Sequence, residues 1–158
     1  MSLLENESTG RFAPVFTKTK LRFRKREEVV RELHRTEDEW RTRLTPQQFR
    51  VLRQGGTDRP FSVPDVRPGG SGAYHCAGCG TALFPADTKF ESGTGWPSFS
   101  DAVGDNVERR RDFSAGLPRT EVRCRPCGGH LGHVFGDGPA PSGQRYCINA
   151  SALASDGA

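Results

Sequence analysis

The chain of 158 residues has no long hydrophobic run, and this absence limits where the protein acts. No stretch approaches the roughly 18 apolar residues that a membrane-spanning helix needs. The first residues also lack an apolar run of signal-peptide length, and Glu5 and Glu7 are unlike a transit peptide. We therefore expect a cytoplasmic protein with no membrane partner, where thiols stay reduced and paired cysteines favour metal or redox chemistry.

Strong charge of one sign is absent as well. The net charge of +4 and the pI near 9.0 are compatible with nucleic acid or acidic partners but do not require them. The length suits one well-buried domain. The 19 glycines and 11 prolines favour many turns and short strands over long helices.

The first 35 residues form a predicted N-terminal extension, partly ordered, ahead of a main domain at 36–154. The segment KTKLRFRKR (Lys18–Arg26) is basic, and EEVVRELH after it predicts a short helix. A basic arm for nucleic acid or a partner is one interpretation. A solvated tail is the other, and the lone aromatic Phe23 favours it.

Two capping boxes begin short helices at the start of the main domain. Thr36 with Glu39 forms the first box, and Thr45 with Gln48 forms the second. Gly55 then supplies a helix stop. The predicted helices span 37–43 and 46–54, and the apolar residues expected to cover one side of the domain are Trp40, Leu44, Phe49 and Leu52.

The rest of the chain predicts a β-rich domain. Residues 56–72 are rich in turn formers and predict a loop that crosses the surface. Beyond this loop, short apolar and alternating segments separated by turn residues predict strands. The predicted strands are 73–76, 81–84, 119–124, 130–135 and 144–149.

Four of the five cysteines form two Cys-x-x-Cys pairs, Cys76 with Cys79 and Cys124 with Cys127. In each pair the two-residue spacer lets both thiolates face one ion, so together they supply the four sulfur ligands of a structural zinc site. Iron in a similar sulfur cage is the competing interpretation. Four sulfurs close the coordination shell, so this metal is expected to hold the fold together rather than to catalyse.

The fifth cysteine lies in the alternating segment RYCIN. In a strand, Tyr146 and Ile148 point to one face, and Arg145, Cys147 and Asn149 to the other. A thiol flanked by a guanidinium and a carboxamide on one face is a candidate reactive site. A buried structural cysteine is the alternative, because free cysteine is often buried in cores.

Several motifs, in this order along the chain, resemble the methionine sulfoxide reductase B family. The resemblance runs from about Thr36 to Leu153 and leaves the N-terminal extension outside it. The motifs are GTGWPSF (Gly93–Phe99), RTEVRC (Arg119–Cys124), HLGHVF (His130–Phe135), DGP (Asp137–Pro139) and RYCIN (Arg145–Asn149).

The resemblance implies a mainly β fold of two antiparallel sheets with short N-terminal helices and a zinc site made by the four paired cysteines. It also implies a repair enzyme that reduces the R-epimer of methionine sulfoxide in oxidised proteins, and we expect a monomer. The implied catalytic residues are Cys147, His133, His130, Asn149 and Arg145, the implied substrate contacts are Trp96, Phe135 and Asp137, and the implied zinc ligands are Cys76, Cys79, Cys124 and Cys127.

The chemistry of a sulfoxide suits these residues. A thiolate at Cys147, favoured by Arg145, attacks the sulfur. His133, helped by His130 and Asn149, protonates the oxygen, and a sulfenic acid forms. A regular strand points these two histidines to opposite faces. A bulge or bend allowed by Gly129 and Gly132 brings both to the thiol; otherwise only one of them reaches Cys147, and the other has a structural role.

One residue departs from the family pattern in an important way. Many relatives carry a recycling cysteine in the motif before Trp96, and Thr94 stands there in this chain. The other cysteines are assigned to the metal, so no partner remains for an internal disulfide. We expect thioredoxin, glutaredoxin or a small thiol to reduce the sulfenic acid directly.

Two further interpretations come from other functional classes. A zinc-ribbon module would use the basic arm and Arg109–Arg111 to hold nucleic acid, although such a module has no need for a thiol among arginine, asparagine and histidine. An oxidation sensor would use the same thiol without turnover of methionine sulfoxide. We expect the reductase, with no nucleic-acid partner.

Overall fold

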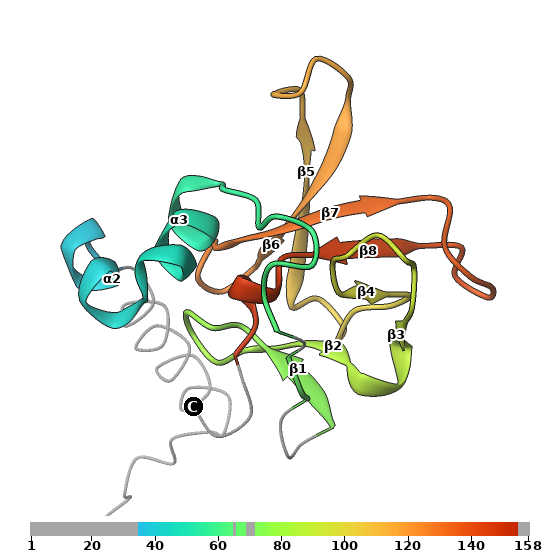
Figure 1. The fold of residues 1–158 in the computed structure, drawn as a ribbon, viewed down its shortest axis with the longest axis horizontal. Coiled ribbons are helices and arrows are strands. Elements are labelled where there is room, and N and C mark those ends of the chain that lie inside the picture. The colour runs from blue at the N-terminus through green and yellow to red at the C-terminus, as the bar shows by residue number, and fades with distance from the viewer. Residues whose placement is uncertain (1–34, 65, 69–71, 155–158) are drawn as a thin grey trace, which may run out of the picture.

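The computed structural model describes residues 35–64, 66–68 and 72–154 (Figure 1). The basic segment Lys18–Arg26 and the helix predicted after it lie outside the described residues. Over the described ranges, no helix is long and apolar enough to cross a membrane.

The two predicted helices are confirmed, as α2 (Glu37–Arg43) and α3 (Pro46–Gln54). The Thr36 hydroxyl accepts a hydrogen bond from the backbone N–H of Glu39 at 3.3 Å, and the Glu39 carboxylate accepts one from the Thr36 backbone at 3.0 Å. The second capping box has the same pair of bonds. Gly55, with φ at 68°, ends α3 in the left-handed conformation that glycine adopts without steric cost.

The rest of the described chain forms two antiparallel sheets, as expected, with two short 3₁₀ helices. The elements are β1 (Ala73–His75), β2 (Ala82–Pro85), η1 (Ala86–Thr88), β3 (Lys89–Phe90), β4 (Ser98–Phe99), β5 (Val107–Asp112), β6 (Arg119–Cys124), β7 (His130–Phe135), β8 (Arg145–Ile148) and η2 (Ala150–Ala152). The small sheet pairs β1 with β2, and the large sheet has the order β3-β4-β8-β7-β6-β5.

The five predicted strands correspond to β1, β2, β6, β7 and β8, whereas β3, β4 and β5 are additional. Strands β3 and β4 have two residues each, too few for any alternation to be visible. Strand β5 reads VERRRD, and charged residues are poor strand formers. It lies at the edge of the large sheet, where exposed charge protects a strand from pairing with other chains.

Aromatic side chains fill the core between the two sheets. Phe99 of β4 stacks on Phe84 of β2 with ring centroids 4.5 Å apart, and it meets Tyr74 of β1 edge-on at 5.0 Å. Tyr146 of β8 lies 5.5 Å from Phe84. Helix α3 packs against β7 and η2 at one end of the large sheet (Figure 1). The apolar residues expected to cover the domain are buried, namely Trp40, Leu44, Phe49 and Leu52.

Strand β7 is irregular where it pairs with β6. His133 lies opposite Glu121 and Gly132 opposite Val122, but the next residue of β6, Arg123, lies opposite His130. One extra residue of β7 is thus inserted, and this bulge places both histidines on the same face of the sheet. Their ring centroids lie 5.6 Å apart.

Gly132 lets β7 approach β8 at the bulge. A Cβ atom at this position would overlap the carbonyl oxygen of Cys147 and crowd the backbone of Ile148. Both neighbours belong to the main chain of β8, so neither is free to move aside.

We expect Gly132→Ala to destabilise the fold by about 3 kcal/mol, because the added methyl group forces β7 and β8 apart. Urea unfolding measures the free energy of unfolding. The control is Gly136→Ala, since a Cβ at Gly136 meets no atom within 4 Å. Equal unfolding midpoints for the two variants would contradict the close approach.

Candidate active site and metal centre

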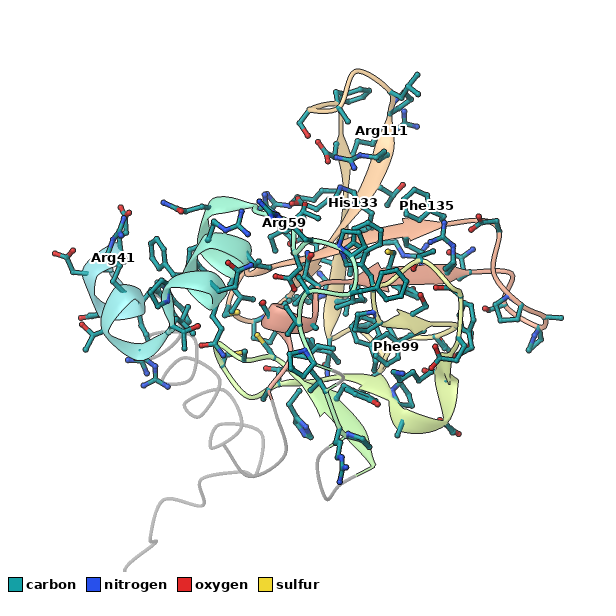
Figure 2. The ribbon with its side chains drawn as sticks, viewed as in Figure 1. Arg41, Arg59, Phe99, Arg111, His133 and Phe135 are labelled. Carbon is teal, nitrogen blue, oxygen red and sulfur yellow. The ribbon has the colours of Figure 1, made fainter. Side chains whose placement is uncertain are left out.

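Hydrogen-bonded pairing aligns the candidate nucleophile with polar residues on three neighbouring strands. Cys147 of β8 lies opposite Ser98 of β4 on one side and His133 of β7 on the other, and His133 lies opposite Glu121 of β6. Residues directly opposite in antiparallel strands share a face of the sheet. Figure 2 shows His133 and Phe135 along β7, with Arg111 further out on the β5–β6 hairpin.

A cavity of about 300 Å³ opens at this row, and Cys147 is part of its wall. Six of the eight residues predicted for catalysis or substrate binding line it, while His130 and Asp137 do not. The complete lining is Thr57, Thr94, Trp96, Arg119, Gly132, His133, Phe135, Arg145, Cys147 and Asn149.

The Cys147 thiol is partly buried in this cavity, and burial raises its pKa above the ordinary value. The Arg145 guanidinium and a hydrogen bond from Thr94 oppose this shift without cancelling it. The free protein therefore favours the thiol form more than the sequence predicts. Arg145 remains the charge that most favours the thiolate.

Arg145 is held in place by two contacts. The carboxylate of Asp137 accepts hydrogen bonds from its Nε at 2.9 Å and from its terminal nitrogen at 3.2 Å. Its guanidinium also lies over the ring of Phe135, 4.6 Å from the centroid. Asp137 thus reaches the cavity only through Arg145, which in turn lowers the pKa of Asp137.

Each histidine pairs with a carboxylate on a neighbouring strand. His133 Nε2 lies 2.8 Å from Asp112 of β5, and His130 Nδ1 lies 2.6 Å from Glu121 of β6. Hydrogen bonds from Ser114 and His133 hold the pKa of Asp112 well below its usual range, so this partner stays anionic. Such pairing fixes the orientation and tautomer of an imidazole.

The two histidines differ in burial. His130 is 5% exposed, and burial lowers its pKa even though Glu121 opposes the shift. Its Nε2 atom is buried and has no hydrogen-bond partner among the described residues. His130 is therefore a neutral imidazole near neutral pH, and only His133 lines the cavity.

Asp58 connects two residues of the cavity wall. Its carbonyl oxygen accepts a hydrogen bond from the Trp96 indole at 2.9 Å, and its backbone N–H donates to Asn149 Oδ1 at 2.9 Å. Its buried carboxylate accepts hydrogen bonds from Gln47 and from the backbone and hydroxyl of Ser151. The loop predicted to cross the surface is anchored inside the protein at this residue.

Sequence reasoning missed Asp58, Asp112 and Glu121 as parts of the site. Alternation in RTEVRC places Glu121 on the polar face of its strand, and this signal was sufficient to select it. Asp112 ends a strand that the sequence does not reveal, and Asp58 lies in a turn-rich loop. Only tertiary packing brings these two to the site.

The four paired cysteines meet, as their spacing predicts. Their sulfur atoms all lie within 4.8 Å of one another, with Cys76 and Cys127 3.7 Å apart and Cys79 and Cys124 3.5 Å apart. A tetrahedral ion with metal–sulfur bonds of about 2.3 Å needs sulfur atoms roughly 3.8 Å apart. The cluster therefore fits a metal ion held by four sulfurs.

The cluster joins separate parts of the fold. Cys76 follows β1 in the small sheet and bridges Leu153 near the C-terminus, whereas Cys124 ends β6 of the large sheet. Arg53 of α3 donates to the carbonyl of Cys127 at 2.8 Å, and its guanidinium lies over the ring of Trp40. A metal here links both sheets and the helical flank.

The arginines Arg109–Arg111 do not form one basic patch. They alternate along β5, so neighbouring side chains leave opposite faces of the sheet. Arg109 donates to the Tyr146 hydroxyl and lies over its ring, while Arg110 pairs with Glu108 at 3.2 Å. This arrangement does not favour the nucleic-acid module.

Comparison with known proteins identifies the family. A SelR domain model matches residues 44–156. "Peptide methionine sulfoxide reductase MsrB" of Leptospira interrogans is 50% identical over 123 residues, which are 77% of this chain and 94% of that protein. The protein of the same name from Methanosarcina barkeri is 55% identical over 122 residues, 77% of this chain and 86% of that protein. The resemblance in the motifs is thus confirmed, and the chain belongs to the SelR-domain family of peptide methionine sulfoxide reductases B.

Proposed function

We propose that the protein reduces the R-epimer of methionine sulfoxide in proteins to methionine, with Cys147 as the nucleophile. The observation that carries this proposal is the position of the thiol in an open cavity, with an indole, a guanidinium and a carboxylate-paired imidazole in the same wall. Family membership agrees with it.

The cavity offers apolar contacts for the methyl group on the substrate's sulfur atom and a polar contact for its oxygen atom. The apolar S-methyl group packs on Trp96 and Phe135, a preference worth about 1–3 kcal/mol. The polar oxygen turns toward His133. Since Asp58 holds the Trp96 indole at 2.9 Å, the apolar wall is fixed before substrate arrives.

The reaction moves one oxygen atom and two electrons. The Cys147 sulfur attacks the sulfoxide sulfur, the sulfur–oxygen bond of the substrate breaks, and methionine leaves. The oxygen ends on Cys147 as a sulfenic acid, and the thiol proton balances the equation. Cysteine is oxidised by two electrons and the sulfoxide is reduced by two.

We assign proton donation to His133 rather than His130. His133 lines the cavity, and its Nε2 lies 2.8 Å from the anionic Asp112, which orients the imidazole. His130 is neutral and buried, so its role is to support the ring of His133. Asn149 is a positioning residue, because its amide donates to Leu131 and its oxygen accepts from Asp58.

An external thiol completes the cycle in this proposal. Thr94 lines the cavity beside Cys147, in the place where many relatives carry a recycling cysteine. The four other cysteines lie together in the metal cluster. Thioredoxin, glutaredoxin or a small thiol therefore reduces the sulfenic acid, and the cytoplasm, the expected location, contains all three classes of reductant.

Zinc is the metal we propose for the four-cysteine cluster, with a structural role. Four cysteine sulfurs at tetrahedral spacing are the usual ligands of structural zinc, although iron accepts the same cage. A bound ion would offset part of the negative charge of the four thiolates and would join the two sheets. All four ligand positions are taken by protein, so the chemistry at Cys147 proceeds without it.

The proposed activity is tested by turnover of the separate R and S sulfoxide epimers with dithiothreitol as reductant. We expect turnover of the R-epimer alone, and Cys147→Ser should lower it about a thousandfold or more, because the variant has no sulfur to accept the oxygen. Metal content and unfolding midpoint should stay unchanged in the variant. Turnover of the S-epimer, or of neither, refutes the proposal.

Regeneration is tested by oxidising the protein with substrate in the absence of reductant. We expect dimedone to trap a sulfenic acid at Cys147 and few internal disulfides to form. Thr94→Cys provides the matched comparison, because it places a thiol beside Cys147 and should replace the trapped sulfenic acid with a disulfide. An internal disulfide at Cys147 in most unmodified molecules would be incompatible with the one-cysteine cycle.

The pH dependence of Cys147 alkylation by iodoacetamide tests the role of Arg145. Arg145 lowers the pKa that burial raises, so Arg145→Met should move the midpoint of the alkylation profile to higher pH and slow alkylation at pH 7. Arg111→Met removes one exposed charge of the same sign and should leave the profile in place. An unchanged profile for Arg145→Met would show that the guanidinium does not stabilise the thiolate.

A further inference from the structure

Phe61 is unusual both in its exposure and in its backbone. Its side chain is 79% exposed, and its φ of 61° is the only positive value at a non-glycine residue in the described part of the chain. A bulky residue seldom adopts this conformation, because its Cβ atom crowds the backbone. Such strain persists where surrounding structure enforces it, often at binding sites.

The loop that carries Trp96 enforces this conformation. The Phe61 backbone N–H donates to the carbonyl of Gly95 at 2.9 Å. A Cβ atom at Gly95 would lie 2.7 Å from two carbons of the Phe61 ring, so the absence of a side chain there makes room for the ring. The aromatic ring is thereby held against the loop and left open to solvent.

Phe61 lines a second cavity, of about 270 Å³, next to the catalytic one. Both cavities include Trp96 in their walls, so this residue separates them. The second cavity has a mixed lining, in which the apolar part is formed mainly by Phe61, Val63, Phe90 and Pro97 and the polar part includes Ser92 and Ser98. Its two charged residues, Lys89 and Glu91, form an ion pair at 3.5 Å.

We infer that this second cavity binds an apolar or aromatic side chain that neighbours the methionine sulfoxide in a polypeptide substrate, with Phe61 as the contact that it meets. The inference rests on the proposed function. Free methionine sulfoxide fills only the catalytic cavity, whereas an extended polypeptide carries further side chains about 3.3 Å along for each residue.

The lining of this cavity favours an apolar occupant. The exposed ring of Phe61 loses contact with water when an apolar side chain packs on it. This burial of apolar surface contributes favourable binding free energy.

The test compares kcat/KM for three kinds of substrate with the full-length protein. These are N-acetylmethionine R-sulfoxide, a peptide with methionine sulfoxide flanked by two glycines on each side, and four peptides with one phenylalanine at each flanking position. We expect one of the four to exceed the glycine peptide about tenfold, as burial of one apolar side chain predicts. Phe61→Ser should remove this gain and leave the other two substrates unchanged, whereas Phe61→Leu should keep part of it.

Phe113→Ser is the matched control. Phe113 is also exposed, at 63%, but it lies on the β5–β6 turn and does not line the second cavity. Equal rates for all peptides, an equal loss in Phe113→Ser, or a loss on the N-acetyl substrate in Phe61→Ser would each overturn the inference. Absence of turnover of all of these substrates by the unmodified protein would instead overturn the proposed function, and the subsite with it.

Discussion

The candidate site depends on the bulge in β7 and on the glycine beside it. Without the inserted residue, His130 and His133 would leave opposite faces of the sheet, and only one of them would lie beside the thiol. Gly132 then lets β7 reach β8 closely enough for His133 to lie opposite Cys147. A sheet held by main-chain hydrogen bonds positions side chains more rigidly than loops do, which suits a reaction that needs a thiol and a proton donor at fixed spacing.

Burial and charge act in opposite directions at the thiol. The cavity excludes water from Cys147 and so disfavours the thiolate, while Arg145 favours it from the same strand. Asp137 and Phe135 keep that guanidinium in place. A thiol that ionises poorly in the free protein is protected from adventitious oxidation. Arg145 is therefore the group through which this strand opposes the effect of burial on the thiol.

Much of the fold was predictable because its signals are local. Capping boxes and Gly55 define α2 and α3, and alternation defines β6, β7 and β8. Strands β3, β4 and β5 were not predictable, since two of them are too short to show a pattern and β5 is mostly charged. Their strand conformation comes from hydrogen bonds to neighbours that are remote in the sequence, which no local pattern encodes.

The sequence by itself determined which residues are candidates for the chemistry. The spacing of four cysteines predicts their cluster, and their assignment to metal isolates Cys147 as the free thiol. Only the tertiary structure decided which groups support that thiol. Asp58 and Asp112 come from a loop and an edge strand far from it along the chain, and their roles follow from hydrogen bonds that exist only after packing. The two histidines are the same residue type and differ only in their surroundings. His130 is buried, whereas His133 lines the cavity.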